Sequence, residues 1–176
     1  MSCGSSASPN ASKAGKGEDG FGLVELLIAM VILNVGLLAI IASFQAGIVT
    51  LSRASRVTTA AVLADQQMEL YRAITYDSIR LASATIPSAA PYTTDPAYNA
   101  TQITGPCAGP PYPDECNASR AVTGADNKAY LLSTYIVPTA PAGGRAVKQV
   151  TIVVRDGQNM SRVYVRQAAG FDQSTG

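Results

Sequence analysis

The chain has 176 residues, 47% of them hydrophobic, and its 13 lysines and arginines nearly balance its 12 aspartates and glutamates. This length favours one folded domain with appended segments, and the net charge of +1 indicates neither a nucleic-acid-binding surface nor an acidic tail. Histidine is absent, so the commonest general base and the commonest neutral metal ligand are missing. The sequence also lacks nucleophile, phosphate-binding and metal-ligand motifs. We therefore expect no enzyme, no catalytic residue, no cofactor and no metal site.

The first twenty residues are small and polar, with too few apolar side chains to form a core. We expect residues 1–20 to be a tail or a leader peptide. Cys3 lies in this segment, but no hydrophobic stretch precedes it, so a lipoprotein site is not expected.

An almost uninterrupted apolar run follows, from Phe21 to Ala42. As a helix it would be about 33 Å long, enough to cross a hydrocarbon core of about 30 Å. We expect residues 21–45 to form a single transmembrane helix. The run contains one acid, Glu25. A carboxylate costs about 2.5–3.5 kcal/mol at mid-bilayer, which indicates a functional role; the alternative is that Glu25 reaches the water at the interface.

The helical pattern continues beyond this run. No proline or glycine occurs from Val57 to Leu81, and the apolar residues recur with helical periodicity. We therefore predict one rod from about residue 21 to about residue 82, in which residues 46–82 are an amphipathic continuation. Val62 and Gln67 are exceptions to the pattern. The predicted apolar arc consists of Val57, Ala60, Ala61, Leu63, Ala64, Met68, Leu70, Tyr71, Ile74, Ile79 and Leu81.

Residues 83–172 are predicted to form a globular domain, and 173–176 a flexible tail. The domain begins with a long loop rich in proline, glycine and polar residues, which includes at most a short strand. Three segments rich in β-branched and aromatic residues follow. They are residues 130–137, 147–155 and 162–167. We expect an antiparallel meander covered by the amphipathic helix, which makes the fold class α+β.

Cys107 and Cys116 lie in the predicted loop with eight residues between them. Without the N-terminal segment the number of cysteines is even, which indicates one disulfide and an oxidising compartment. The alternative is two reduced thiols. A disulfide would place the C-terminal part outside the cytoplasm and would contribute about 2.5–3 kcal/mol by closing the loop. Asp114 with Glu115, or Asp126 with Asn127, could offer oxygen ligands to calcium, but we favour the interpretation that these are solvated loop residues.

Gly20, Phe21 and Glu25 stand at the head of the apolar helix, behind a polar segment that contains lysines. This junction resembles that of precursors in the type IV pilin and pseudopilin superfamily. The resemblance implies a pilin-like fold and a prepilin peptidase/methyltransferase that cleaves between Gly20 and Phe21 and N-methylates Phe21. In an assembled filament, the carboxylate of Glu25 would neutralise the terminal amine of a neighbouring subunit.

The same resemblance implies the location and the partners. The protein would be a single-pass inner (cytoplasmic) membrane protein with an extracytoplasmic C-terminal domain, later part of a pilus (fimbrium) or pseudopilus. Its partners would be other pilin or pseudopilin subunits, the inner-membrane assembly platform and the lipid bilayer, with no nucleic acid. Gly36 together with residues 60–74 resembles PilV-type minor pilins and the I-type pseudopilin of type II secretion. The alternatives are a major pilin or a non-assembling, membrane-tethered extracytoplasmic binding module.

Overall fold

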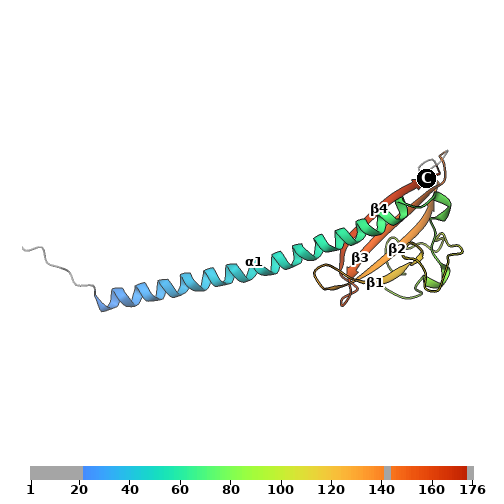
Figure 1. Ribbon diagram of the computed structural model, residues 1–176. Coiled ribbons are helices and arrows are strands. Elements are labelled where there is room, and N and C mark those ends of the chain that lie inside the picture. The colour runs from blue at the N-terminus through green and yellow to red at the C-terminus, as the bar shows by residue number, and fades with distance from the viewer. Residues whose placement is uncertain (1–21, 141–143, 174–176) are drawn as a thin grey trace, which may run out of the picture. The chain divides into compact units, whose positions relative to one another are not determined.

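The computed structural model of the protein describes residues 22–140 and 144–173 (Figure 1). The chain divides into two compact units between Gly47 and Ile48, and one long helix, α1, contributes to both. Three 3₁₀ helices and four strands follow α1. The elements are α1 (Leu23–Arg72), η1 (Tyr76–Ser78), η2 (Ser83–Thr85), η3 (Asp114–Cys116), β1 (Ser119–Thr123), β2 (Ala129–Thr139), β3 (Val147–Asp156) and β4 (Val163–Asp172).

The second unit is built on an antiparallel sheet with the strand order β1-β2-β3-β4. The predicted α+β fold, a long N-terminal helix packed on a small antiparallel sheet, is therefore confirmed. The prediction of three strands was one short, because β1 also pairs with β2, from Ser119↔Ser133 to Thr123↔Ala129. Strand β1 has only five residues, none of them fully buried, and it lies within a stretch dominated by turn residues. Its sequence therefore gave little strand signal.

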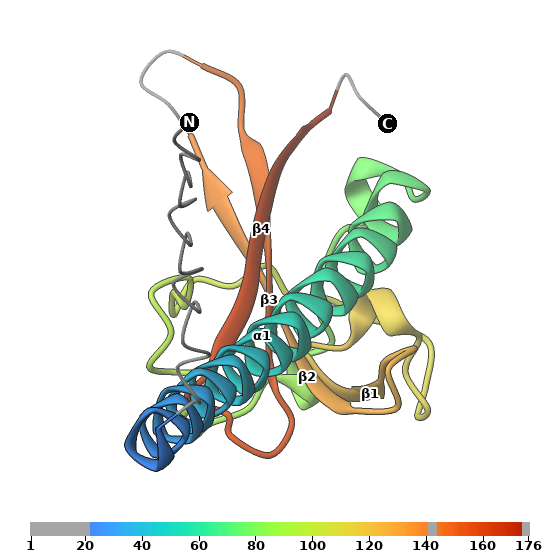
Figure 2. The same ribbon diagram turned by 90° about the vertical axis from the view of Figure 1, so that its left-hand side faces the viewer.

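The sheet is covered on both faces. Gln167 in β4 is the cross-strand partner of Ile152 and donates a hydrogen bond to Asp65 of α1 (2.9 Å), so this face carries the helix (Figure 2). Neighbouring side chains of a strand point to opposite faces. Tyr135 accordingly lies on the other face, where the ring of Tyr92 from the loop stacks on it with a centroid separation of 4.4 Å. Burial from both sides explains the apolar run from Ile152 to Val154 in β3.

The buried side of α1 agrees with most of the predicted arc. Ala60, Ala64, Met68 and Tyr71 are fully buried and belong to the same core as the sheet residues. The two alanines bring the helix backbone close to the sheet, since they leave no long side chain between them. Val57, at the start of the predicted arc, is instead exposed.

The end of the helix differs from the prediction. Helix α1 ends at Arg72, about ten residues before the predicted end near residue 82, and Thr75 already has an extended backbone (φ −67°, ψ 151°). Leu81 is buried as predicted, but from an extended segment that forms a parallel bridge to Thr104. Buried side chains two residues apart, at Ile79 and Leu81, fit an extended chain as well as the helical arc. The apolar pattern alone therefore placed the helix end too late.

Candidate functional site: the apolar helix and its charged boundary

In the first unit, α1 presents its apolar side chains outward. Every residue from Gly22 to Gly47 is exposed, although most of them are large and apolar. Exposed fractions of the large ones range from 45% at Ile41 to 79% at Leu23. Apolar area in water is unfavourable by about 25 cal/mol per Å², so this surface requires cover by lipid or by other protein. Among the described residues, α1 is the one helix whose length and composition would allow it to cross a membrane.

Polar side chains within the apolar segment bond to the helix itself. The Nδ2 atom of Asn34 donates to the carbonyl of Met30, and the hydroxyl of Ser43 donates to the carbonyl of Ala39, both at 2.9 Å. Bonds of this kind to the preceding turn satisfy the hydroxyl donor of Ser43 and one N–H of Asn34 within the helix. The second N–H and the Oδ1 of Asn34 can still bond to another polar group.

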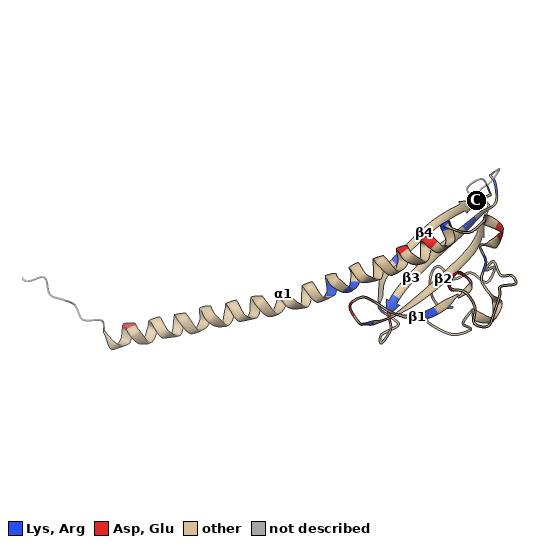
Figure 3. Cartoon of the chain, in the orientation of Figure 1, with Lys and Arg blue, Asp and Glu red and all other residues tan. Residues whose placement is uncertain are grey.

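Glu25 lies in the first turn of α1. The backbone N–H groups of Glu25 and Leu26 donate to the carbonyl of Gly22 at 2.9 and 3.2 Å, which closes this turn. A carboxylate there is favourably placed, because the N-terminal end of a helix carries partial positive charge. Figure 3 shows this acid at one end of a long uncharged stretch of α1. The predicted leader (1–20), cleavage site and methylation site, with Gly20 and Phe21, lie outside the described residues.

The charged boundary of the apolar stretch begins at Arg53, the next charged residue after Glu25. Three residues later, Arg56 donates from Nη1 to Asp156 Oδ2 (3.3 Å) and to the hydroxyl of Tyr164 (3.1 Å), and that hydroxyl donates to Asp156 (2.6 Å). The bond from Tyr164, with others from backbone N–H groups, lowers the pKa of Asp156 below its ordinary value. The ionised carboxylate thus joins α1 to the β3–β4 hairpin.

The predicted disulfide is present. Cys107 and Cys116 are bonded, with their Cα atoms 6.4 Å apart, and Cys116 closes η3. The carbonyls of η3 face α1: the hydroxyl of Tyr71 donates to Glu115 O (2.6 Å), and Gln67 Nε2 donates to Asp114 O (3.0 Å). The disulfide loop is therefore attached to the helix by side chains of α1.

Gln67 is the residue of this attachment that the sequence did not identify. It is buried among the apolar residues of α1, and its Oε1 accepts a bond from Arg120 of β1 at 2.8 Å. A buried amide must have hydrogen-bond partners, because an unpaired polar group in a core is costly. The sequence pointed to this role only by placing a polar residue, Gln67, on the apolar arc of the helix.

The loop acids considered for calcium have protein partners. Asp114 forms an ion pair with Arg120 (2.6 Å), and Asp126 accepts from the hydroxyl of Tyr130 (2.6 Å). Within residues 22–140 and 144–173, no group of three or more acids or cysteines could hold a metal ion. These acids are part of the hydrogen bonding within the domain.

A buried charged cluster ties the loop to the far face of the sheet. Asp95 accepts from Arg155, from Arg166 at 2.6 and 3.1 Å, and from the backbone N–H of Ala97 at 2.8 Å. Burial alone would raise the pKa of Asp95, but the hydrogen bonds and the two guanidinium groups outweigh it and lower that pKa. The cluster was not predicted, because both arginines are 60 or more residues from Asp95 in the chain.

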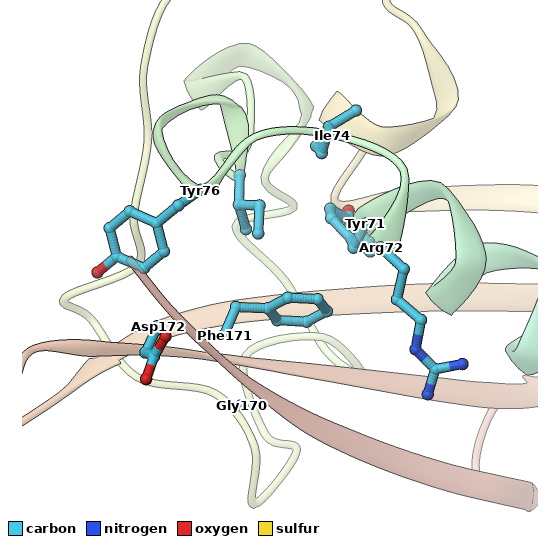
Figure 4. Close-up of a pocket in the computed structure, with 8 residues that line it drawn as sticks. Tyr71, Arg72, Ile74, Tyr76, Gly170, Phe171 and Asp172 are labelled. Carbon is cyan, nitrogen blue, oxygen red and sulfur yellow. The ribbon is translucent and has the colours of Figure 1, made fainter. Parts of the chain in front are cut away.

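A cavity of about 230 Å³ lies beside the end of α1. Figure 4 shows the ring of Phe171 at its centre, with Arg72 and Asp172 on opposite sides. Two of the lining residues, Tyr76 and Ile79, accept hydrogen bonds at their carbonyls from the ammonium group of Lys148 (2.7 Å to Tyr76). The lining is largely aromatic and aliphatic, which suits contact with an apolar group.

Comparison with protein families matches residues 15–41 to the family described as "Prokaryotic N-terminal methylation motif". Neither the curated proteins nor the solved structures include a match to this chain. The matched range contains Gly20, Phe21 and Glu25, together with most of the exposed apolar helix. The motif supports a type IV pilin-like protein that is processed as a prepilin, and the apolar helix agrees with a membrane-anchored chain.

Proposed function

We propose that the protein is a structural subunit, minor rather than major, of a type IV pilus or of a type II secretion pseudopilus. One observation carries the proposal: the methylation motif coincides with a helix that exposes an uninterrupted apolar surface and one acid in its first turn. A surface of this kind contributes nothing to the fold of its own chain. It is instead suited to lipid first and to neighbouring subunits afterwards.

Processing would prepare this helix for assembly. A prepilin peptidase/methyltransferase cleaves between Gly20 and Phe21, and the new amine of Phe21 is N-methylated. That amine lies four residues before Glu25 in the sequence. At the membrane interface the carboxylate stays hydrated, whereas among the packed helices of a filament it would be buried, and there the terminal amine of a neighbouring subunit offsets its charge. Glu25 would therefore favour one register between adjacent subunits.

Assembly would exchange lipid for neighbouring helices. The assembly platform of the inner membrane, driven by a separate motor ATPase, would draw the subunit from the bilayer into the filament. Small residues allow helices to approach closely where no hydrophobic driving force separates lipid from protein. The apolar segment carries such residues at Gly22, Ala29, Gly36, Ala39 and Ala42.

The disulfide supports the orientation of the chain. Cys107 and Cys116 are bonded in the second unit, and disulfides persist in oxidising compartments. We therefore place the domain formed by residues 48–173 on the extracytoplasmic side of the inner membrane. Residues 21–45 would be the span.

Substitution of Glu25 tests the proposal. In E25L the precursor should still be cleaved, as shown by N-terminal sequencing, whereas the amount of subunit in sheared filaments should fall at least tenfold. The matched control is E69A, which removes an exposed carboxylate that lies in the same helix outside the matched motif and pairs with Arg72. Normal incorporation of E25L would contradict the assembly role and favour a membrane-tethered binding module. A mature N-terminus other than methylated Phe21 would contradict the processing step.

A further inference from the structure

A basic hollow lies at the start of the second unit, next to the end of the apolar stretch in sequence. It is a cavity of about 440 Å³, a size typical of ligand sites (about 300–1,000 Å³). We call it the basic hollow; its lining consists of Ile48, Val49, Ser52, Arg53, Arg56, Arg162 and Tyr164. Three of these residues are arginines and none is acidic.

Two of the three arginines are available to a ligand. Arg56 is occupied by Asp156 and Tyr164. Among the described residues, by contrast, no acid forms an ion pair with Arg53 or with Arg162, whose guanidinium lies 6.0 Å from the centre of the Tyr164 ring. The hollow therefore carries positive charge that its own chain does not neutralise.

The length of the uncharged stretch that precedes the hollow in the sequence would place the hollow at a membrane interface. The 27 residues between Glu25 and Arg53 contain no charged side chain. As a helix they measure about 40 Å, close to the 40–45 Å thickness of a bilayer that includes its headgroups. Figure 3 shows this uncharged stretch ending at the first basic residues of α1. With Glu25 near one interface, Arg53 comes to the level of the phosphates in the opposite leaflet.

The lining is also suited to a phospholipid in its chemistry. Arginine binds phosphate oxygens through two parallel N–H groups, and basic residues at a membrane surface attract anionic lipids. Ile48 and Val49 offer apolar contact to the glycerol and upper acyl region, whereas Tyr164 has the amphipathic ring that is enriched at interfaces.

We propose that the basic hollow binds the phosphate of an anionic phospholipid in the extracytoplasmic leaflet while the subunit is stored in the membrane. The inference rests on the proposed function for the membrane stage. Release of this lipid would accompany the departure of the subunit into a filament, because a filament holds α1 away from the leaflet.

The test uses the full-length chain reconstituted in vesicles of phosphatidylcholine with a trace of spin-labelled lipid. The fraction of motionally restricted label gives the association of phosphatidylglycerol relative to phosphatidylcholine. Each charge near an anionic headgroup contributes about fivefold, so the two arginines together contribute at most about 25-fold. We therefore expect a preference of about tenfold for phosphatidylglycerol in the unmodified chain, which falls to near equality in R53Q/R162Q and is largely retained in R53K/R162K.

The matched control is R72Q/R145Q, which removes the same charge from the end of α1 and from the segment before β3, and it should keep the tenfold preference. An equal association of both lipids in the unmodified chain, or an unchanged preference in R53Q/R162Q, would overturn the inference. So would loss of the preference on adding inorganic phosphate at constant ionic strength, since the ligand would then be a soluble anion. Carbonate extraction separates the two proposals: a chain released from vesicles contradicts the membrane stage itself, whereas an inserted chain without lipid preference contradicts the hollow alone.

Discussion

The two halves of α1 use apolar side chains for opposite purposes. Before Gly47, large apolar residues such as Leu33 are exposed. After Ile48, Met68 and Tyr71 are fully buried against the sheet. The same helical conformation therefore forms a surface for partners outside the chain in the first unit and part of the protein core in the second. Substitutions should consequently change assembly in one half and stability in the other.

The largest effect on stability is expected at Asp95. Replacement by asparagine leaves Arg155 buried without its counter-charge, and breaking a buried ion pair costs about 3–5 kcal/mol. Urea unfolding of the full chain in detergent, followed by the near-ultraviolet circular dichroism of the tyrosines, would measure it. D65N is the control, because Asp65 is exposed and accepts a hydrogen bond from the exposed side chain of Gln167; its cost should stay below about 0.5 kcal/mol. Equal costs for the two variants would show that the buried cluster does not stabilise the second unit.

Loss of the disulfide should have the next largest effect. In C107S/C116S the free energy of unfolding should fall by about 2.5–3 kcal/mol, because the loop between the cysteines is no longer closed in the unfolded chain. Reduction of the unmodified protein should cause the same decrease in the urea midpoint, and reduction of the double variant none. A further decrease in the urea midpoint of the variant on reduction would mean that the reductant acts elsewhere than on this disulfide.

The same substitution in both halves of α1 tests the comparison directly. A64L forces three extra carbon atoms into a fully packed position and should cost about 1–3 kcal/mol of unfolding free energy. A39L makes the same change at an exposed position, so the urea midpoint of the domain should not move. Instead, A39L should lower incorporation into filaments, because it separates helices that approach through small residues. A comparable loss of stability in both variants would contradict the division of roles.

The smallest expected effect is confined to acid conditions. The pKa values of Asp95 and Asp156 in the folded protein lie below their ordinary value of 3.8. The unfolded chain therefore binds these protons more readily, so their contribution is complete above about pH 4 and is lost as the pH falls through the folded values. The melting temperature should decrease on this acid side, and it should do so less steeply in D95N/D156N. An equally steep decrease in that variant would assign the acid sensitivity to other groups.

Much of the architecture follows from sequence patterns that are local. The apolar stretch up to Gly47, the strands β2 to β4 and the cysteine pair all have signals within a few residues of themselves. The end of α1 did not, because it depends on pairing with a segment farther along the chain. Strand β1 pairs with the adjacent β2, but its five residues are too short and too exposed to give a strand signal. Leu81 becomes extended through its bridge to Thr104.

The candidate site shows the same limit. Glu25 is recognisable because a single acid interrupts an apolar run. The basic hollow is not, because Arg53 and Arg162 are 109 residues apart (162 − 53) and only the fold brings them to one cavity. Gln67 and Asp95 likewise gain their roles from partners on other elements, which periodicity in the sequence does not describe.

The side-chain bonds that Asn34 and Ser43 make to their own helix have a consequence for the direction of travel. Because both bonds lie within the helix, they stay formed whether lipid or a neighbouring helix covers the segment. Neither bond would have to break when a subunit leaves the bilayer for a filament, nor when it is withdrawn into the bilayer again.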